Sequence, residues 1–596
     1  MIVKMKKVTM MVSNKDKEES LALLRKEGVM HVRHLSTPQA AEISSNEEKI
    51  SQAQKALIIL SQEKLKEHKK TITSLNEHEI TSKIQQIFSI RQTIDDLDKN
   101  IQDTEIVLSW YSLWGKFYPE EIIQLRNKDI YIKLYLLNKN EYNGIRNQNN
   151  IYLIKQVDGS FYISAVFYKE DLSLPFEEIK IPSQNHDELS EKLEIYKKKI
   201  TENKKLLSEQ IVFKKEIDEL IQRLQNKNKF LEVFYGMRNE EKFSLIQGFC
   251  PEQEVPKIIS LAKKNNLGYL IETPSQDEEP PTLIKNPKWL TMVNPIFEFI
   301  NTLPGYAEFD ISAVFLLFFS IFFAMIVGDA GYGLLFFMAT FFIRKKFKNI
   351  PPQPFHLMYV LSIATIVWGA ISGTWFSFEQ IAKLPVINSL VINKVNSFAK
   401  ESQLFVMYLC FVIGVVHLTI GHIMKYIREI NSVNSLTQLG WISILWGLFF
   451  LAGTLILNKP FPVFAKYLLI VGVTTVLIFS NFQKNIIKGI ALSFVDTFLG
   501  CTGGFSDIIS YLRLFAVGSA SVAIASSFNT MAIGGGTSNV IGGIIAAFII
   551  FFAHALNITL SFLAVIVHGL RLNMLEFSGH LGMQWSGHKY EPFREE

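Results

Sequence analysis

The sequence has few cysteines and no motif for binding a nucleotide or attacking a substrate. Its three cysteines, Cys250, Cys410 and Cys501, lie far apart along the 596 residues. This spacing gives neither a disulfide framework nor a cysteine-ligated metal site, and it is typical of free thiols. The one Gly-Lys pair, at 115–116, is followed by Phe, so the phosphate-binding pattern GxxxxGK[ST] is absent. No HExxH, CxxC or Ser/His/Asp pattern occurs either, so we expect no catalytic site, metal or cofactor in this chain.

Charge is scarce in the second half of the chain. Residues 1–303 hold 44 Lys and Arg against 44 Asp and Glu, whereas residues 304–596 hold only 17 and 12. The net charge of +5 therefore belongs to the apolar half. This change in charged-residue content predicts two domains, a charged one over 1–303 and a membrane domain over 304–596. The opening MIVKMKKVTMMVSNKD has no apolar core of signal-peptide length, so we expect the charged domain to stay in the cytosol.

Long apolar runs fill the second half, and a membrane-spanning helix needs about 20 such residues. The predicted segments are 308–327, 330–344, 357–378, 403–424, 438–457, 462–480, 488–531 and 540–578. GDAGYG at 328–333 divides the first two into a tight helical hairpin. The last two are long enough to require strong tilt or projection beyond the bilayer. The fold class expected is thus an α-helical membrane protein with eight transmembrane helices.

Eight spans place both termini on the same side of the membrane. The loops and span ends on that side carry Arg344, Lys345, Lys346, Lys348, Lys425, Arg428, Lys484 and Lys488. Those on the opposite side carry Lys383, Lys394, Lys400, Lys459 and Lys466. The excess of cations on the first side predicts cytosolic N- and C-termini under the positive-inside rule.

Polar residues form a stripe along each of the last two spans. In the final span the stripe contains His554, Asn557, Ser561, Ala564, His568, Arg571, Leu575 and Ser578, at spacings of three and four. These spacings place them on one helix face over about 36 Å. The preceding span carries Thr502, Ser506, Ser510 and Arg513 at the same spacing.

Arg513 is the only Lys or Arg between residues 488 and 571. Holding an arginine within a bilayer costs about 2.5–3.5 kcal/mol on insertion scales. Small polar residues in such helices also serve as packing contacts, and an arginine near a helix end, such as Arg571, can extend to the interface. Two arginines on adjacent spans, each within a polar stripe, favour an ion pathway.

The charged half predicts α/β lobes joined by long helices. Strand–helix–strand patterns open the chain, in KMKKVTMMVSNKDKEESLALLRKEGVMHVRHL, and recur in KFSLIQGFCPEQEVPKIISLAKKNNLGYLIE. Heptad-like helices from residue 43 to 60 and from 189 to 224 flank the β-rich runs IYIKLYLL and FYISAVFY. This order predicts an α+β cytosolic domain with a long antiparallel coiled coil. A single exposed helix of a larger bundle would give the same heptads. SQDEEPPTLIKNP is the predicted linker into the membrane.

These motifs together resemble a known family over nearly the whole chain. The N-terminal strand–helix–strand, GFCPEQEV, PGYAEFD, GDAGYG, GVVHLTIG, SYLRLFAVGSA and HGLRLNMLEF are similar to the membrane stator subunit of rotary V-type and A-type ATPases, called subunit a or subunit I. The last two motifs are the specific ones. The resemblance implies that Arg513 is the primary stator arginine facing a rotating proteolipid ring, that Arg571 is the second, and that Glu576 is an acidic position just beyond it.

The sequence departs from the family pattern at several positions. Ser521 and Ser561 stand where eukaryotic relatives tend to carry a His and a Glu, and Asp310-Ile311 replaces an Asp-Pro. We therefore expect His554, Asn557 and Asp329 to line the extracellular half of the ion path. The short soluble half and compact C-terminus are typical of bacterial members and favour the bacterial plasma membrane.

The resemblance implies a non-catalytic stator subunit that forms ion half-channels and couples ATP hydrolysis or synthesis to H⁺ or Na⁺ translocation. Implied partners are the proteolipid ring (c/K subunits), peripheral stalk subunits (E/G type), a central-stalk subunit (d/C type) and the lipid bilayer, with no nucleic acid. Two other classes stay open: a secondary transporter with a regulatory coiled coil, although no inverted repeat is seen, and a membrane tether without transport.

Overall fold

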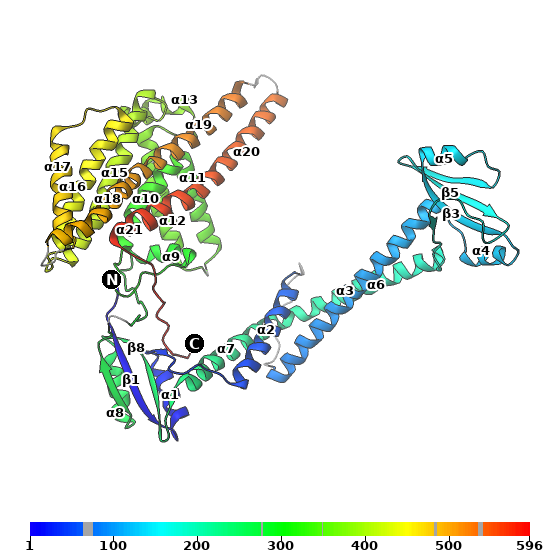
Figure 1. The fold of residues 1–596 in the computed structure, drawn as a ribbon, viewed down its shortest axis with the longest axis horizontal. Coiled ribbons are helices and arrows are strands. Elements are labelled where there is room, and N and C mark those ends of the chain that lie inside the picture. The colour runs from blue at the N-terminus through cyan, green and yellow to red at the C-terminus, as the bar shows by residue number, and fades with distance from the viewer. Residues whose placement is uncertain (63–74, 276–277, 349, 482–485, 535–539, 596) are drawn as a thin grey trace. The chain divides into compact units, whose positions relative to one another are not determined.

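The computed structural model describes residues 1–596 except 63–74, 276–277, 349, 482–485, 535–539 and 596 (Figure 1). Lys484 of the predicted cytosolic loop and residues 276–277 of the predicted linker lie outside the described residues. The chain forms two compact units, one of residues 1–10, 27–32 and 247–593, the other of 11–26, 33–246 and 594–596. The domain boundary at 303–304 stays a prediction.

The unit built mainly from residues 33–246 contains long helices and a small sheet (Figure 1). Its helices are α1 (Lys17–Glu27), α2 (Ala41–Gln62), α3 (Glu77–Trp114), α4 (Pro119–Arg126), α5 (Lys139–Ile145), α6 (His186–Glu209) and α7 (Lys214–Gly236). Its antiparallel sheet has the order β4-β5-β3-β6, from β3 (Tyr131–Asn138), β4 (Ile151–Val157), β5 (Ser160–Phe167) and β6 (Glu178–Ile179). The two predicted β-rich runs are therefore neighbouring strands.

Heptad positions supply the core of these helices. Buried isoleucines recur along α3 at 80, 84, 87, 90 and 94, together with Leu207 of α6 and Ile217 of α7. Helix α3 packs against α6, and α2 packs against α7. The sequence reading did not anticipate the 38-residue α3. This helix follows the first heptad helix and leads into the part of the chain that forms the small sheet. A coiled coil in the strict sense stays a prediction.

A second sheet has the order β2-β8-β1-β9. Its strands are β1 (Met5–Ser13), β2 (His31–Arg33), β8 (Phe243–Pro251) and β9 (Gly268–Glu272), and α8 (Val255–Lys264) connects the last two. Strand β8 also pairs with β7 (Arg238–Asn239). Both predicted strand–helix–strand patterns are confirmed, and Gly28 has the positive φ of 62° that its turn requires.

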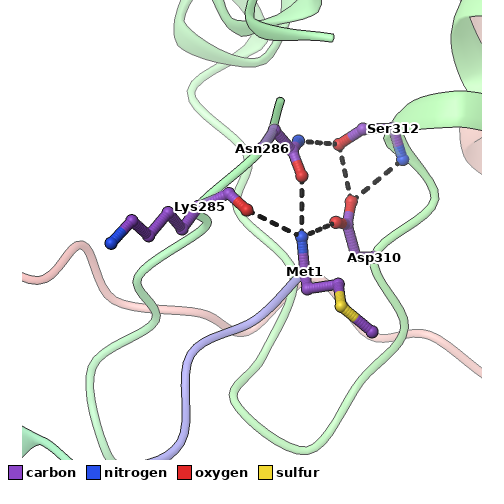
Figure 2. Close-up of polar contacts among 5 residues, drawn as sticks. All are labelled: Met1, Lys285, Asn286, Asp310 and Ser312. Carbon is purple, nitrogen blue, oxygen red and sulfur yellow. Dashed lines mark hydrogen bonds and ion pairs between the residues drawn. The ribbon is translucent and has the colours of Figure 1, made fainter. Parts of the chain in front are cut away.

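Polar contacts hold the start of the chain against the entry to the first apolar helix (Figure 2). The Met1 ammonium group pairs with Asp310 Oδ2 at 2.5 Å and donates to Asn286 Oδ1 at 2.7 Å. Ser312 donates to Asp310 Oδ1 through both its backbone N–H and its hydroxyl. Burial acts to raise the pKa of Asp310, but the ammonium group and the Ser312 donors outweigh it and hold that pKa below its usual value.

Each predicted membrane segment corresponds to helix. In chain order these helices are α10 (Ser312–Val327), α11 (Ala330–Lys346), α12 (Pro352–Ser372), α15 (Lys400–Arg428), α16 (Ser435–Leu457), α17 (Val463–Phe479), α18 (Ile486–Ser510), α19 (Leu512–Gly534) and α20 (Val540–Ala564). Two π-helical stretches, η4 (Val565–Gly569) and η5 (Leu572–Phe577), continue α20 into the short α21 (Ser578–Leu581). Short helices α9 (Asn294–Ile300), α13 (Glu379–Ala382) and α14 (Pro385–Asn388) lie outside these segments.

Among the described residues, five stretches are long and apolar enough to cross a membrane: α12, α15, α16, residues 489–533 and residues 540–581. Helices α10 and α11 form a sixth candidate, bent by 119° at Gly328 and Asp329, while α17 is shorter. The structure thus supports five or six spans in an apolar, mostly helical unit. The count of eight stays a prediction.

Close packing fixes α19 in this helical unit. Helix α19 lies beside α20 and contacts α10 (Figure 1). A Cβ on Gly518 would collide with the Met325 carbonyl oxygen of α10, so this position has no space for a side chain. Gly518 therefore lets α19 approach α10 closely.

Candidate functional site

The two membrane arginines converge on one carboxylate oxygen. Arg513, in the first turn of α19, has its Nη2 3.7 Å from Glu576 Oε1. Arg571, the residue just before η5, has its Nε 3.5 Å from the same oxygen. The Glu576 side chain is only 4% exposed, whereas those of Arg513 and Arg571 are 25% and 53% exposed. Both guanidinium groups are thus reachable from outside the chain while their carboxylate partner is not.

The π-helical geometry of η5 brings Arg571 and Glu576 together. These residues are five apart, a spacing that an α-helix would place far round its circumference. A π-helix repeats its hydrogen bonds at five residues, and such stretches occur frequently at functional sites. Glu576 Oε2 is buried without a hydrogen-bond partner among the described groups. The site therefore holds a carboxyl group with spare acceptor capacity beside two fixed cations.

A second polar network joins α11, α19 and α20. The Tyr332 hydroxyl lies 2.6 Å from His554 Nδ1 and accepts from Asn557 Nδ2 at 3.1 Å. His554 Nε2 lies 3.1 Å from Asn529 Oδ1, and Asn529 Nδ2 donates to the Phe376 carbonyl at 2.8 Å. One tautomer satisfies all these contacts: Tyr332 donates to His554, which donates to Asn529. We refer to this set, with Ser521 and Ser561, as the tyrosine network.

The two serines at the departures from the family pattern contact each other in this network. Ser521 Oγ and Ser561 Oγ lie 3.1 Å apart, and Ser521 also donates to Asn557 Oδ1 at 3.2 Å. Ser521, Asn557 and Ser561 are all buried. Neutral hydroxyl and amide groups thus fill the position where His and Glu were expected in eukaryotic relatives.

Asp329 acts as a backbone cap in this structure. It is 1% exposed, and its Oδ1 accepts from the backbone N–H groups of Gly331, Tyr332 and Phe376. Its Oδ2 accepts from the backbone and hydroxyl of Ser377. Phe376 and Ser377 have positive φ of 49° and 53°, so these bonds stabilise a strained turn. Asp329 thereby positions Tyr332, and its direct exposure to an ion stays a prediction.

Ser510 and His568 take part in neither of these networks. Ser510 is the half-buried last residue of α18, and His568 is half-buried in η4, three residues before Arg571. The sequence reading missed Tyr332 and Asn529, whose only signal was their polarity within apolar runs. It also missed two hydrogen-bonded histidines, His422 and His580, with Asp507.

The comparisons place these features in a family. No protein-family model matches the sequence. The chain is 35% identical to V-type ATP synthase subunit I of Borreliella burgdorferi over 625 aligned residues, covering 100% of both chains. It is 28% identical to V-type ATP synthase subunit I 1 of Treponema pallidum, again covering 100% of both.

A solved structure also matches part of the chain. It is a crystal structure of the cytoplasmic N-terminal domain of subunit I, a homologue of subunit a of V-ATPase, and it matches 45% of this chain and 99% of that one. The identity is 14% and the TM-score 0.25, too low to compare the two folds. The full-length identity to the Borreliella protein, together with the apolar helices described above, is decisive: this chain is a membrane protein that belongs to the subunit I family of V-type ATP synthases.

Proposed function

We propose that this chain is the membrane stator of a rotary V-type ATPase, in which it forms two ion half-channels against a rotating proteolipid ring. The observation that carries the proposal is the convergence of Arg513 and Arg571 on one oxygen of Glu576. The chain contributes no nucleotide chemistry; it couples ATP hydrolysis or synthesis in other subunits to translocation of H⁺ or Na⁺.

The arginine pair would act on a carboxylate of the ring. An opposite charge within about 4–6 Å favours the ionised form of a carboxylate, and a low dielectric strengthens the effect. A ring carboxylate reaching Arg513 would therefore release its ion. The exposed fractions of Arg513 and Arg571 leave both groups accessible to such a partner. Arginine keeps its charge when buried, whereas lysine can lose a proton.

Glu576 would be the resident counter-ion of this site. It occupies the space between the two guanidinium groups that a ring carboxylate would otherwise compete for. A partner inside the chain reduces the cost of holding two cations in the membrane domain. It also weakens the electrostatic attraction between each arginine and a ring carboxylate, so that the carboxylate can leave the site as well as enter it.

The tyrosine network would line the extracellular half-channel. Its hydroxyl, amide and imidazole groups include His554, Asn557 and Ser561 of the predicted stripe, and they continue along α20 away from Arg571. Ser510 and His568 would line the path on either side of the arginines. Asp329 would act there by holding Tyr332 in place.

The rest of the chain would connect this membrane site to the other stationary subunits of the complex. The long helices α3 and α6 give reach without catalytic residues, so we infer that their lobes bind peripheral stalk subunits of the E/G type and contact a central-stalk subunit of the d/C type. Both termini would lie in the cytosol of a bacterium, with eight spans in the plasma membrane. A secondary transporter or an inert tether would require none of these partners, so purification of the intact complex separates the alternatives.

The direct test is Arg513→Gln in the complete ATPase, measured as ATP-driven ion uptake into everted membrane vesicles. Glutamine keeps much of the length and the hydrogen bonding but removes the cation, so we expect uptake to be abolished while the complex still assembles. Arg513→Lys should be severely impaired, and Arg571→Gln damaged but less completely, because Arg571 is more exposed. Near-normal uptake by an assembled Arg513→Gln complex would contradict the proposal. Subunit content is the control for assembly.

A further inference from the structure

A chain of four polar side chains runs through the membrane unit beside the arginine site. Asp507 Oδ2 of α18 lies 3.0 Å from His580 Nε2 of α21. His580 Nδ1 lies 2.9 Å from His422 Nε2 of α15, and His422 Nδ1 lies 2.8 Å from Gln438 Oε1 of α16. We call this set the histidine chain. Asp507 precedes Arg513 by six residues, about 9 Å of helix, so the chain ends next to the site proposed above.

Burial increases from one end of the histidine chain to the other. The Asp507 side chain is 31% exposed and that of His580 13%, while His422 and Gln438 are 4% and 6% exposed. The His422 ring also stacks on Trp441, with an interplanar angle of 18°. Buried polar groups of this kind must have their hydrogen bonds satisfied. Where the hydrogens lie can therefore be worked out from the donors and acceptors.

In the arrangement observed, the histidine chain must hold one proton beyond a neutral pair of rings and a carboxylate. Gln438 Oε1 only accepts, so His422 Nδ1 carries a hydrogen, and its Nε2, as a lone pair, accepts from His580 Nδ1. His580 Nε2 then faces Asp507 Oδ2. That contact requires a proton, either on the His580 ring as an imidazolium or on the Asp507 carboxyl group.

A second complete arrangement exists without that proton. If the Gln438 amide turns by 180°, its NH₂ group donates to His422 Nδ1, and His422 Nε2 donates to His580 Nδ1. His580 Nε2–H then donates to an ionised Asp507. All contacts stay satisfied in both arrangements, which differ by one proton and the orientation of one amide. A purely structural cluster requires only one such arrangement.

We propose that the histidine chain is a proton-storing site that passes H⁺ between the cytosol and the ring carboxylate beside Arg513. This inference rests on the proposed function and adds the identity of the ion. His422 lies six residues before the end of α15 and Gln438 in the first turn of α16, which are cytosolic ends in the predicted topology. To load the histidine chain, His422 Nδ1 takes a proton from the cytosol as the Gln438 amide turns, one hydrogen moves from His422 Nε2 to His580 Nδ1, and another moves from His580 Nε2 to Asp507. Asp507 then gives its proton to an ionised ring carboxylate, and the cycle closes when both rings return from the Nδ1–H to the Nε2–H tautomer.

The chemistry of the histidine chain favours H⁺ over Na⁺. Hard cations take oxygen ligands, whereas the central contact of the histidine chain joins two imidazole nitrogens, His422 Nε2 and His580 Nδ1. Among the described residues, charged or titratable groups near the histidine chain include Lys425, next to Gly582, the His417–Tyr511 pair and Glu576. Among these, Glu576 is already paired with Arg513 and Arg571.

The test uses Asp507→Asn and His580→Gln in the complete ATPase. Both substitutions keep hydrogen bonding and size but remove a proton-holding group. Because positioned proton transfer contributes large factors, we expect ATP-driven acidification of everted vesicles in Na⁺-free medium to fall at least about tenfold. Asp496→Asn is the matched control, since Asp496 lies exposed on the same helix, and it should leave acidification unchanged.

The outcomes separate this inference from the proposed function. If Arg513→Gln abolishes uptake but assembled Asp507→Asn and His580→Gln complexes acidify vesicles at the control rate, the histidine chain is structural and only this inference fails. If Arg513→Gln complexes pump normally, the proposed function itself fails. Should both variants fail to assemble, the wild-type complex decides: transport that requires Na⁺ and produces no acidification would overturn the inference.

Discussion

At the scale of single residues, Glu576 is the shared partner of two arginines. It is buried, and one of its two carboxylate oxygens, Oε1, is the shared partner of Arg513 and Arg571. Glu576→Gln preserves the shape of the side chain but leaves two cations without their counter-charge. We expect a loss of about 1–3 kcal/mol of stability in the purified chain, measured by thermal unfolding in detergent. Glu401→Gln, an exposed acid at the start of α15, is the control. Equal stability of the two variants would show that the arginines do not depend on Glu576.

Another residue-scale prediction concerns the thiol of Cys250, which is fully buried in β8. Burial raises the pKa of Cys250 to about 12. At pH 8 only about one thiol in ten thousand would be the reactive thiolate. A maleimide should therefore leave Cys250 unmodified at pH 8 until the protein unfolds, as mass spectrometry of the labelled peptides would show. Modification at the rate of an exposed cysteine would mean that β8 opens readily.

At the scale of elements, the contact between α10 and α19 depends on a glycine. A side chain on Gly518 would meet the Met325 carbonyl, whereas one on Gly503 of α18 would meet nothing within 4 Å. Gly518→Ala should therefore separate the two helices and cost about 1–3 kcal/mol of stability, while Gly503→Ala should be neutral or slightly stabilising. Thermal unfolding of both variants checks this, and an equal response would indicate that α10 adjusts without cost.

Most of the helices were predictable because their signals are local, although α3 was missed. Apolar runs of sufficient length and heptads of isoleucine and leucine follow from the order of residues alone. The arginine pair was also predictable, because Arg513 and Arg571 stand out in apolar surroundings. The histidine chain was not, since His422 and His580 are 158 residues apart and each alone resembles an ordinary core histidine. The capping role of Asp329, which is predicted to line the ion path, could not be foreseen, because four of its five donors are backbone N–H groups that a sequence pattern does not display.

At the scale of the whole molecule, the span count determines on which side each loop lies. The loop at Asn431 follows α15 and the loop at Asn458 follows α16, and both positions are exposed. In a chain whose three native cysteines are replaced by serine, single cysteines at 431 and 458 should react with a membrane-impermeant maleimide from opposite sides, Asn431→Cys from the cytosol. Reaction of both from one side would rule out α16 as a span and with it the eight-span topology.

The widened turns of η4 and η5 have a consequence for how the end of this chain evolves. A π-helical turn holds one residue more than an α-helical turn, so deleting one residue inside residues 572–577 and restoring α-helical turns would leave the following residues in nearly the same orientation. Glu576 would then lie four residues after Arg571 and still on its face of the helix. The same deletion in α20 would rotate everything beyond it by about 100°. A single-codon deletion should therefore be far less damaging in this short stretch than in α20, and gaps in alignments of relatives should fall in the π-helical stretch and not in α20.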